Sequence, residues 1–487
     1  MKKLLNKNSY LIVLITVIVG MIIHFSIYTK NLLSADILLY DSYYNSYLWE
    51  ISLGRFGLFI VGLLKSYISI PIIEVFSSLV ILGIINVLLL DFLKIKNKYL
   101  NVVFITCTPI VSCILLFYYC SFSYMISMLS IILSVYLLYK LKSKYKYLIS
   151  IMLTIIALSI YQASISIGIS LIIIYSIKLL FDNKFKIKNL VCNFISILIG
   201  LVIYYILVKI SISLFHINIS DYSNANSLNI LELIKAIPNK IIDSYKYFYY
   251  YFFGNNSEII KNYYMKNHIL NYLLFIVLGI GLIIKLINSK STILNKVIII
   301  ILVLLLPIFM NSISFIVPIS KFQLLMGGSY LVFYYFLFSL IDTKFIKVIS
   351  IILICLLLRN YIVQDQATYL SLNNTKNKYD TIIEGVINNN INNLDKEFMI
   401  YGSLSKSNNF DKIYKMNYGF IGDLDIFWGY DYTNSKNGFI RYMYFYKGLD
   451  VNYVNEENYN KILNSKEFKK INNYYDVLND KIVIKLS

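Results

Sequence analysis

Long apolar runs dominate the first 360 residues of this 487-residue chain. A helix needs about 20 apolar residues to cross a bilayer core, and eleven stretches approach that length. These predicted spans are about 10–28, 72–91, 99–117, 122–139, 147–160, 164–181, 190–212, 270–287, 293–309, 324–340 and 345–360. Since 58% of the residues are hydrophobic and only 15% are charged, a soluble enzyme and a disordered chain are both excluded. The chain is predicted to be an all-α polytopic membrane protein.

Lysine clusters separate these spans and fix their orientation. Clusters flank 99–139 and 147–181 at both ends, so each stretch must cross twice, with turns near Tyr118–Ser123 and Tyr161–Ser164. With eleven spans, all six lysine-rich sites fall on one side, and the positive-inside rule makes that side cytoplasmic. The sites are Lys2, Lys3 and Lys7; Lys94, Lys96 and Lys98; Lys140, Lys142, Lys144 and Lys146; Lys184, Lys186 and Lys188; Lys285, Lys290 and Lys296; Lys344 and Lys347. We therefore expect a multi-pass protein of the cell membrane with a cytoplasmic N-terminus, an uncleaved first helix and an extracytoplasmic C-terminus.

The net charge of +19 does not indicate nucleic-acid binding. Residues 361–487 carry 15 basic and 15 acidic side chains, so the whole excess lies in residues 1–360, between the apolar runs. We predict a transmembrane domain at 1–360 and a small extracytoplasmic α/β domain at 361–487. In this second domain the pattern indicates a polar helix around 365–393 and strands at Glu397–Gly402 and Gly438–Phe445.

Two external loops, 29–71 and 213–269, are expected beside the membrane. The first carries Asp36, Asp41, Glu50 and Arg55. A carboxylate at the lipid–water boundary is partly desolvated, which raises its pKa and suits a general base. Asp36 is preferred over Asp41 because it lies nearer the membrane edge, and a solvated loop acid is the alternative for either. Arg55 can bind phosphate bidentately, or it can be an interfacial arginine whose head reaches water.

Other candidates lie at the outer ends of later spans. Tyr161–Gln162 marks a turn between two short spans, where the glutamine needs a polar partner from a neighbouring helix or a bound sugar. Lys321 can contact a phosphate or serve as an interfacial lysine. The aromatic run Tyr245–Phe253 can border a groove for an isoprenoid chain, although such runs are more often interface belts. The tail aromatics suit glycan contact, or else a domain that only adds stability; they are Phe427, Trp428, Tyr430, Tyr442 and Tyr444.

Short motifs resemble those of a known class. They are Asp36 and Asp41 followed by Trp49–Glu50 and Gly54–Arg55, then Ser159–Ala163, and Asp365–Tyr369 after the last span. The arrangement resembles the C-type (GT-C) membrane glycosyltransferases, and within them the Gtr-type (type II) family of bacterial glucosyltransferases that decorate O-antigens and related surface polymers. The resemblance covers most of residues 10–395. The family often has adjacent acids in the first loop, and an arginine is expected where Lys321 stands.

This resemblance implies a polyprenyl-phosphate sugar donor, with glucose as the expected sugar, and a hydroxyl of a surface glycan as acceptor. It implies Asp36 or Asp41 as the base, and Arg55 and Lys321 on the donor phosphate. Substrate-binding roles fall to Trp49, Glu50, Tyr161 and Gln162. A lipid phosphate leaves without a general acid, so one carboxylate and the cations suffice, with inversion and with no metal or cofactor. A small flippase and a polyprenyl-phosphate sugar synthase are the expected partners.

Two other functional classes remain open. A lipid-linked sugar transporter would need ionisable residues at mid-membrane and repeat symmetry, whereas the acids lie mainly at the outer edge. No nucleotide-binding glycine loop is present, which excludes ATP-driven transport. A glycan polymerase or ligase would place its key residues in the later loop 213–269. A purely structural membrane protein is a weaker third alternative.

Overall fold

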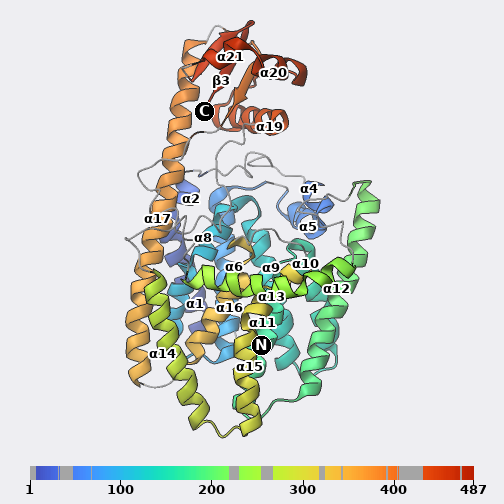
Figure 1. Ribbon diagram of the computed structural model, residues 1–487, viewed down its shortest axis with the longest axis vertical. Coiled ribbons are helices and arrows are strands. Elements are labelled where there is room, and N and C mark those ends of the chain that lie inside the picture. Colours follow the sequence, from blue (N-terminus) through green and yellow to red (C-terminus); the bar gives the residue numbers. More distant parts are fainter. Residues whose placement is uncertain are drawn as a thin grey trace.

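The computed structural model describes residues 7–30, 32, 48–66, 68–218, 230–253, 267–316, 324–341, 344–390, 393–402, 404, 431–471 and 474–486. Its larger part is a helical bundle, and its only described sheet lies near the C-terminus (Figure 1). The bundle helices are α1 (Lys7–Ile23), α2 (Phe25–Thr29), α4 (Leu48–Ser52), α5 (Phe56–Leu64), α6 (Pro71–Leu93), α7 (Lys98–Thr106), α8 (Pro109–Leu116), α9 (Tyr118–Lys140), α10 (Tyr145–Ile160), α11 (Ser164–Phe181), α12 (Ile187–Phe215), α13 (Ile230–Phe253), α14 (Asn267–Asn288), α15 (Ile293–Met310), the 3₁₀ turns η2 (Ser312–Phe315) and η3 (Leu324–Met326), α16 (Gly328–Ser339) and α17 (Lys344–Asn389).

The helices follow the predicted spans. Within the described residues, seven helices are long and apolar enough to cross a membrane: α6, α9, α11, α12, α14, α15 and α17. The pair α7 and α8 makes an eighth if it is one broken span. Helices α1, α10 and α16 also coincide with predicted spans, but they have only 17, 16 and 12 residues. The all-α membrane class is thus confirmed, and the number of eleven crossings stays a prediction.

The predicted span 99–117 is broken rather than straight. Helices α7 and α8 meet at a bend of 47°, with Thr108 in an extended conformation and Pro109 opening α8. Proline excludes the preceding residue from the helical region, which is why the break falls there. The next break is at Phe117, just before the predicted turn at Tyr118–Ser123, and the turn at Tyr161–Ser164 is present as predicted.

Helix α17 joins the bundle to the C-terminal unit without a break. Its 46 residues run along the bundle and on to the sheet, so residue 361 lies inside this helix (Figure 1). Two buried polar contacts fasten it to the bundle. Tyr369 Oη lies 2.7 Å from His24 Nδ1, and Ser112 Oγ donates to Asp365 Oδ2 over 2.5 Å. The predicted polar helix at 365–393 is therefore the second half of α17.

The C-terminal unit is a small sheet with short helices. Its elements are β1 (Phe398–Tyr401), α19 (Tyr432–Tyr442), a π-helical turn (Met443–Lys447), α20 (Glu456–Leu463), α21 (Lys466–Lys470), β2 (Tyr475–Leu478) and β3 (Lys481–Lys485). The strand order is β1-β3-β2, with β3 parallel to β1 and antiparallel to β2. The strand predicted at Glu397–Gly402 is present as β1.

The strand predicted at Gly438–Phe445 is wrong, because this segment is helical. Asp431 caps α19 by accepting a hydrogen bond from the backbone of Asn434 at 2.8 Å. Phe439, Tyr442 and Met443 are all buried, and their spacing of three and four residues is that of a helix face.

The aromatic run Tyr245–Phe253 belongs to α13, which crosses the bundle against α14 and α15 (Figure 1). Part of the run is buried inside the bundle. Phe252 is buried against the ring of Phe333, and Tyr251 stacks on Tyr330 of α16 with ring centroids 4.7 Å apart. This half of the run is helix-packing core.

Candidate active site

The site is built on the turn between α4 and α5. Gly54 has a φ of +81°, and Arg55 follows it as the residue that precedes α5. A Cβ on Gly54 would lie 3.0 Å from the hydroxyl of Tyr204, so this position favours glycine both for its left-handed backbone and for space. The Arg55 N–H donates to the carbonyl of Glu50 at 2.7 Å, which closes the turn. In Figure 1, α4 and α5 lie at the same end of the bundle as the C-terminal unit.

Gln162 holds the side chain of Arg55 in place. Arg55 Nε donates to Gln162 Oε1 at 3.1 Å. The amide nitrogen of Gln162 donates to the carbonyl of Leu53 at 2.8 Å and to Tyr204 Oη at 2.9 Å, and Tyr204 donates to the carbonyl of Gly54 at 3.2 Å. The polar partners of this glutamine are thus Arg55, the turn before it and a neighbouring helix. Its binding of a sugar stays a prediction.

Two stacked tyrosines form the floor beneath the guanidinium. Arg55 Cζ lies 5.2 Å from the ring centroid of Tyr161, a cation–π distance. Tyr161 stacks in turn on Tyr124 of α9, with centroids 4.4 Å apart. Burial by itself lowers the pKa of Arg55, but electrostatic interactions with Tyr124, Tyr161 and Glu50 leave that pKa above its ordinary value. The side chain is a permanent cation held over an aromatic ring.

The free end of Arg55 is the chemically useful part. Within the residues that the structure describes, the side chain makes one hydrogen bond, through Nε to Gln162. Among these residues, neither terminal amino group has an acceptor, so both can donate to a ligand. A guanidinium fixed at Nε and open at its two amino groups can bind two oxygens of a phosphate.

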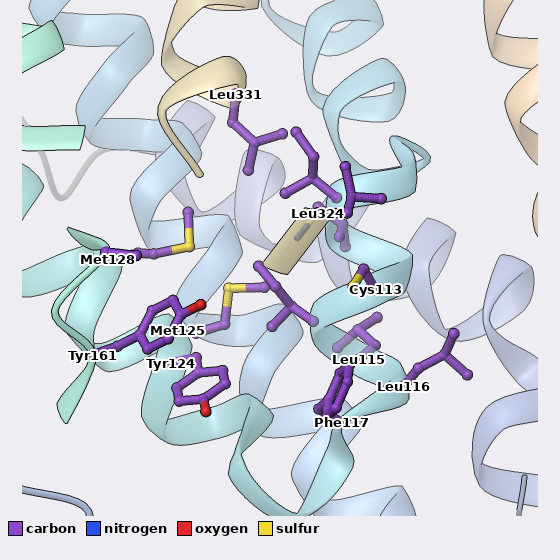
Figure 2. Packing of buried hydrophobic residues seen from close by; sticks show 14 of the residues in the cluster. Cys113, Leu115, Leu116, Phe117, Tyr124, Met125, Met128, Tyr161, Leu324 and Leu331 are labelled. Atoms are coloured by element: carbon purple, nitrogen blue, oxygen red, sulfur yellow. The ribbon is translucent and has the colours of Figure 1, made fainter. Parts of the chain in front are cut away.

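A small apolar cavity lies behind the tyrosines. Its free volume is about 10 Å³, room for a single water molecule, and its lining includes Tyr124, Tyr161, Met128 and Gly328. Figure 2 shows Tyr124 and Tyr161 next to each other at the edge of the buried cluster that contains Met125 and Met128. The guanidinium of Arg55 and this apolar lining thus lie on either side of the tyrosine pair.

The predicted site residues divide into two groups. The structure brings Glu50, Arg55, Tyr161 and Gln162 together, with Glu50 buried, while Trp49 next to Glu50 is 41% exposed. Asp36, Asp41 and Lys321 lie outside the described residues, so their roles stay predictions. Of the tail aromatics, Phe427, Trp428 and Tyr430 also lie outside, Tyr442 is buried and Tyr444 is exposed.

Sequence reasoning missed Tyr204 and Tyr124. Both lie within apolar helices, α12 and α9, and the chain has 46 tyrosines, so neither stands out. It also missed the ion pair between Lys65 Nζ and Glu74 Oε1, 2.6 Å apart. An acid at the start of an apolar span is a signal that could have found this pair. Among the described residues, no three His, Cys, Asp or Glu side chains gather into a metal site.

Comparison with known protein families decides the class of enzyme. Residues 25–341 match the model of the family described as glucosyl transferase GtrII, which is more than half of the chain. The chain belongs to the GtrII glucosyltransferase family. The matched range contains every element of the Arg55 site, from α4 to α12. A search of curated proteins and a search of solved structures each found no match. This GtrII protein is thus a membrane glycosyltransferase, as the resemblance implied.

Proposed function

We propose that the protein transfers glucose from a polyprenyl-phosphate donor to a hydroxyl of a cell-surface glycan, such as an O-antigen. The reaction takes place at the outer face of the cytoplasmic membrane. The observation that carries the proposal is Arg55, which is held at Nε by Gln162 and, among the described residues, has no acceptor at either terminal amino group; apolar side chains lie behind the neighbouring Tyr161. A lipid phosphate needs such a pair, because its head is anionic and its chain is apolar. The family membership supports glucose as the transferred sugar.

The proposed chemistry is a GT-C-type single displacement. An acceptor hydroxyl attacks the anomeric carbon as its proton passes to the carboxylate of Asp36 or Asp41. The bond between the anomeric carbon and the phosphate oxygen breaks, and polyprenyl phosphate leaves with its charge balanced by Arg55 and Lys321. One displacement inverts the anomeric configuration, and no metal takes part. A small flippase and a polyprenyl-phosphate sugar synthase would supply the donor at this face.

The test is transfer of labelled glucose from polyprenyl phosphate to glycan in membranes. Asp36→Asn keeps the shape of the side chain and removes the base, so turnover should fall roughly 10²–10⁴-fold. Asp41→Asn is measured in parallel to identify the base. Asp91→Asn is the matched control, because Asp91 pairs with Lys140 at the end of α6 and takes no part in the proposed site. Near-normal transfer by both Asp36→Asn and Asp41→Asn would contradict the mechanism and favour a polymerase-like site in 213–269.

A further inference from the structure

Four lysine side chains gather at the end of the bundle opposite the Arg55 site. They come from the C-terminal ends of four different helices, α6, α9, α11 and α14, and we call them the lysine cluster: Lys94, Lys140, Lys178 and Lys285. In Figure 1 the C-terminal end of α14 lies at the opposite end of the bundle from the C-terminal unit.

Direct contacts hold three of these lysines around the last turn of α6. Lys178 Nζ donates to the carbonyl of Phe92 at 2.7 Å, and Lys140 Nζ lies 3.2 Å from Asp91 Oδ2. Lys94 ends the same turn, where its backbone N–H bonds to the carbonyl of Asp91. Lysines of three helices therefore converge on one helix end.

Aromatic rings fix two of the ammonium groups and bring in the fourth lysine. Lys178 Nζ lies 5.5 Å from the ring centroid of Tyr175, which stacks on Phe92 with centroids 4.0 Å apart. Lys285 Nζ lies 5.4 Å from the ring centroid of Phe181, three residues after Lys178 on α11. Both distances are those of cation–π contacts, so α14 adds its lysine to the same place.

The cluster carries an excess of positive charge. The charge of Lys178 is opposed by the charges of the other three lysines and favoured by that of Asp182. With Asp91, two carboxylates stand against four ammonium groups, so a charge of 4 − 2 = +2 remains. Charges of one sign held close together repel each other, and an anion bound between them would remove that repulsion.

Lys178 is the lysine best placed to bind such an anion. The residue is half-buried. Among the described residues its Nζ donates to the carbonyl of Phe92 alone, although an ammonium group has three N–H bonds. Capping the end of α6 thus leaves two of its N–H bonds for a ligand.

The position favours the phosphate of a lipid over a free anion. The cluster lies where apolar helices end, and phospholipid headgroups lie at that depth of a membrane. On α14 the surface near Lys285 is apolar, because Ile283 and Ile287 are 56% and 71% exposed. Acyl chains can pack on these side chains while the phosphate reaches the lysines, and a free phosphate gains nothing from them.

We propose that the lysine cluster binds the phosphate headgroup of an anionic phospholipid whose chains lie against α14. The predicted topology assigns this lipid to the cytoplasmic leaflet. The site is separate from the Arg55 site, and its existence does not depend on the proposed glucosyl transfer.

The experiment follows thermal unfolding of the full-length protein in a neutral detergent while phosphatidylglycerol, phosphatidylcholine or inorganic phosphate is added. Phosphatidylglycerol should raise the unfolding temperature in a saturable way, and the other two compounds should not. Lys178→Gln should weaken the binding of phosphatidylglycerol about tenfold, because a hydrogen bond between charged groups is lost. Lys94→Gln changes an exposed side chain and should weaken binding about fivefold, which tests the site even where Lys178→Gln does not fold.

Lys290→Gln is the matched control, because Lys290 is an exposed lysine between α14 and α15 that lies outside the cluster. Its binding of phosphatidylglycerol should equal that of the wild type. Equal weakening in Lys290→Gln and in the cluster variants would overturn the inference, because general surface charge would then explain the binding. Equal stabilisation by phosphatidylcholine would overturn it too. Inorganic phosphate that binds as tightly as phosphatidylglycerol would show a site for a free anion and would contradict the lipid.

Discussion

Two basic side chains lie at the two ends of α5, and they differ in how many hydrogen bonds they donate. Arg55 precedes the helix and Lys65 follows it. Lys65 Nζ donates to Glu74 Oε1 at 2.6 Å, to Ser69 Oγ at 2.9 Å and to the carbonyl of Tyr119 at 2.9 Å. An ammonium group has three N–H bonds, and all three are used here. Arg55 uses only Nε among the described residues and keeps its two amino groups open.

This difference separates a structural cation from one that can bind a ligand. Lys65 joins the end of α5 to the starts of α6 and α9, and its side chain and that of Glu74 are only 14% and 4% exposed. Sequence position suggests the same role for both residues, because each lies at the outer edge of an apolar segment. The two residues differ in how many of their side-chain N–H groups have a hydrogen-bond acceptor among the described residues.

The largest effect is expected at the lysine end. Lys65→Met leaves the carboxylate of Glu74 buried without its cation, which costs about 3–5 kcal/mol of stability. Thermal unfolding in detergent should show a strongly destabilised protein. Lys65→Met combined with Glu74→Leu removes both charges and should recover most of this loss. If the double variant is no more stable than Lys65→Met, the ion pair is not the reason for the loss.

At the arginine end the effect should appear in donor binding. Arg55→Lys keeps the charge but loses the two-pronged geometry, so donor KM should rise ten- to hundredfold, since a hydrogen bond to a charged group contributes about 1.5–3 kcal/mol. The unfolding temperature should change little. Lys65→Arg is the reciprocal control, and it should alter stability rather than donor KM. An unchanged donor KM in Arg55→Lys would contradict the proposal that Arg55 binds the donor phosphate.

A smaller effect is expected from the turn that aims Arg55. Gly54→Ala places a side chain at a φ of +81° and 3.0 Å from Tyr204 Oη, at a cost of about 1–2 kcal/mol. Because Arg55 is the next residue, donor KM should rise severalfold along with the loss of stability. A stability loss with unchanged donor KM would mean that the turn does not set the position of Arg55.

The smallest effect is expected at Tyr204. Tyr204→Phe removes the hydroxyl that accepts from Gln162 and donates to the carbonyl of Gly54, about 1 kcal/mol. Donor KM should rise about twofold to fivefold, and the effect should vanish when Arg55 is already lysine. Additive effects of the two substitutions would show that Tyr204 acts independently of Arg55.

Rare residue types made part of this site predictable. The chain has only three arginines, so Arg55 beside two glycines stood out, and Gln162 stood out because it is polar between two apolar spans. The contact between them crosses from residue 55 to residue 162, and no pattern in one sequence encodes that pairing. Tyr204, which completes it, is one tyrosine among many.

The helical bundle was predictable because membrane spans need uninterrupted apolar length. The length of an apolar run does not reveal where a helix bends, nor which elements form in a polar segment, and the predictions that differ from the structure are of these two kinds. The sharp bend before Pro109 divides one predicted span, although this proline lies within that span in the sequence and could have indicated the bend. Residues 438–445 were predicted as a strand, but the capping Asp431 and the buried Phe439 and Tyr442 belong to a helix.

Helix α17 has a mechanical consequence. Its 46 residues extend about 69 Å, more than twice the ~30 Å of a hydrocarbon core, and it contains no proline at which to bend. A helix of this kind acts as a lever. A force on the C-terminal unit would therefore reach the bundle as torque about the contacts of His24 with Tyr369 and of Ser112 with Asp365.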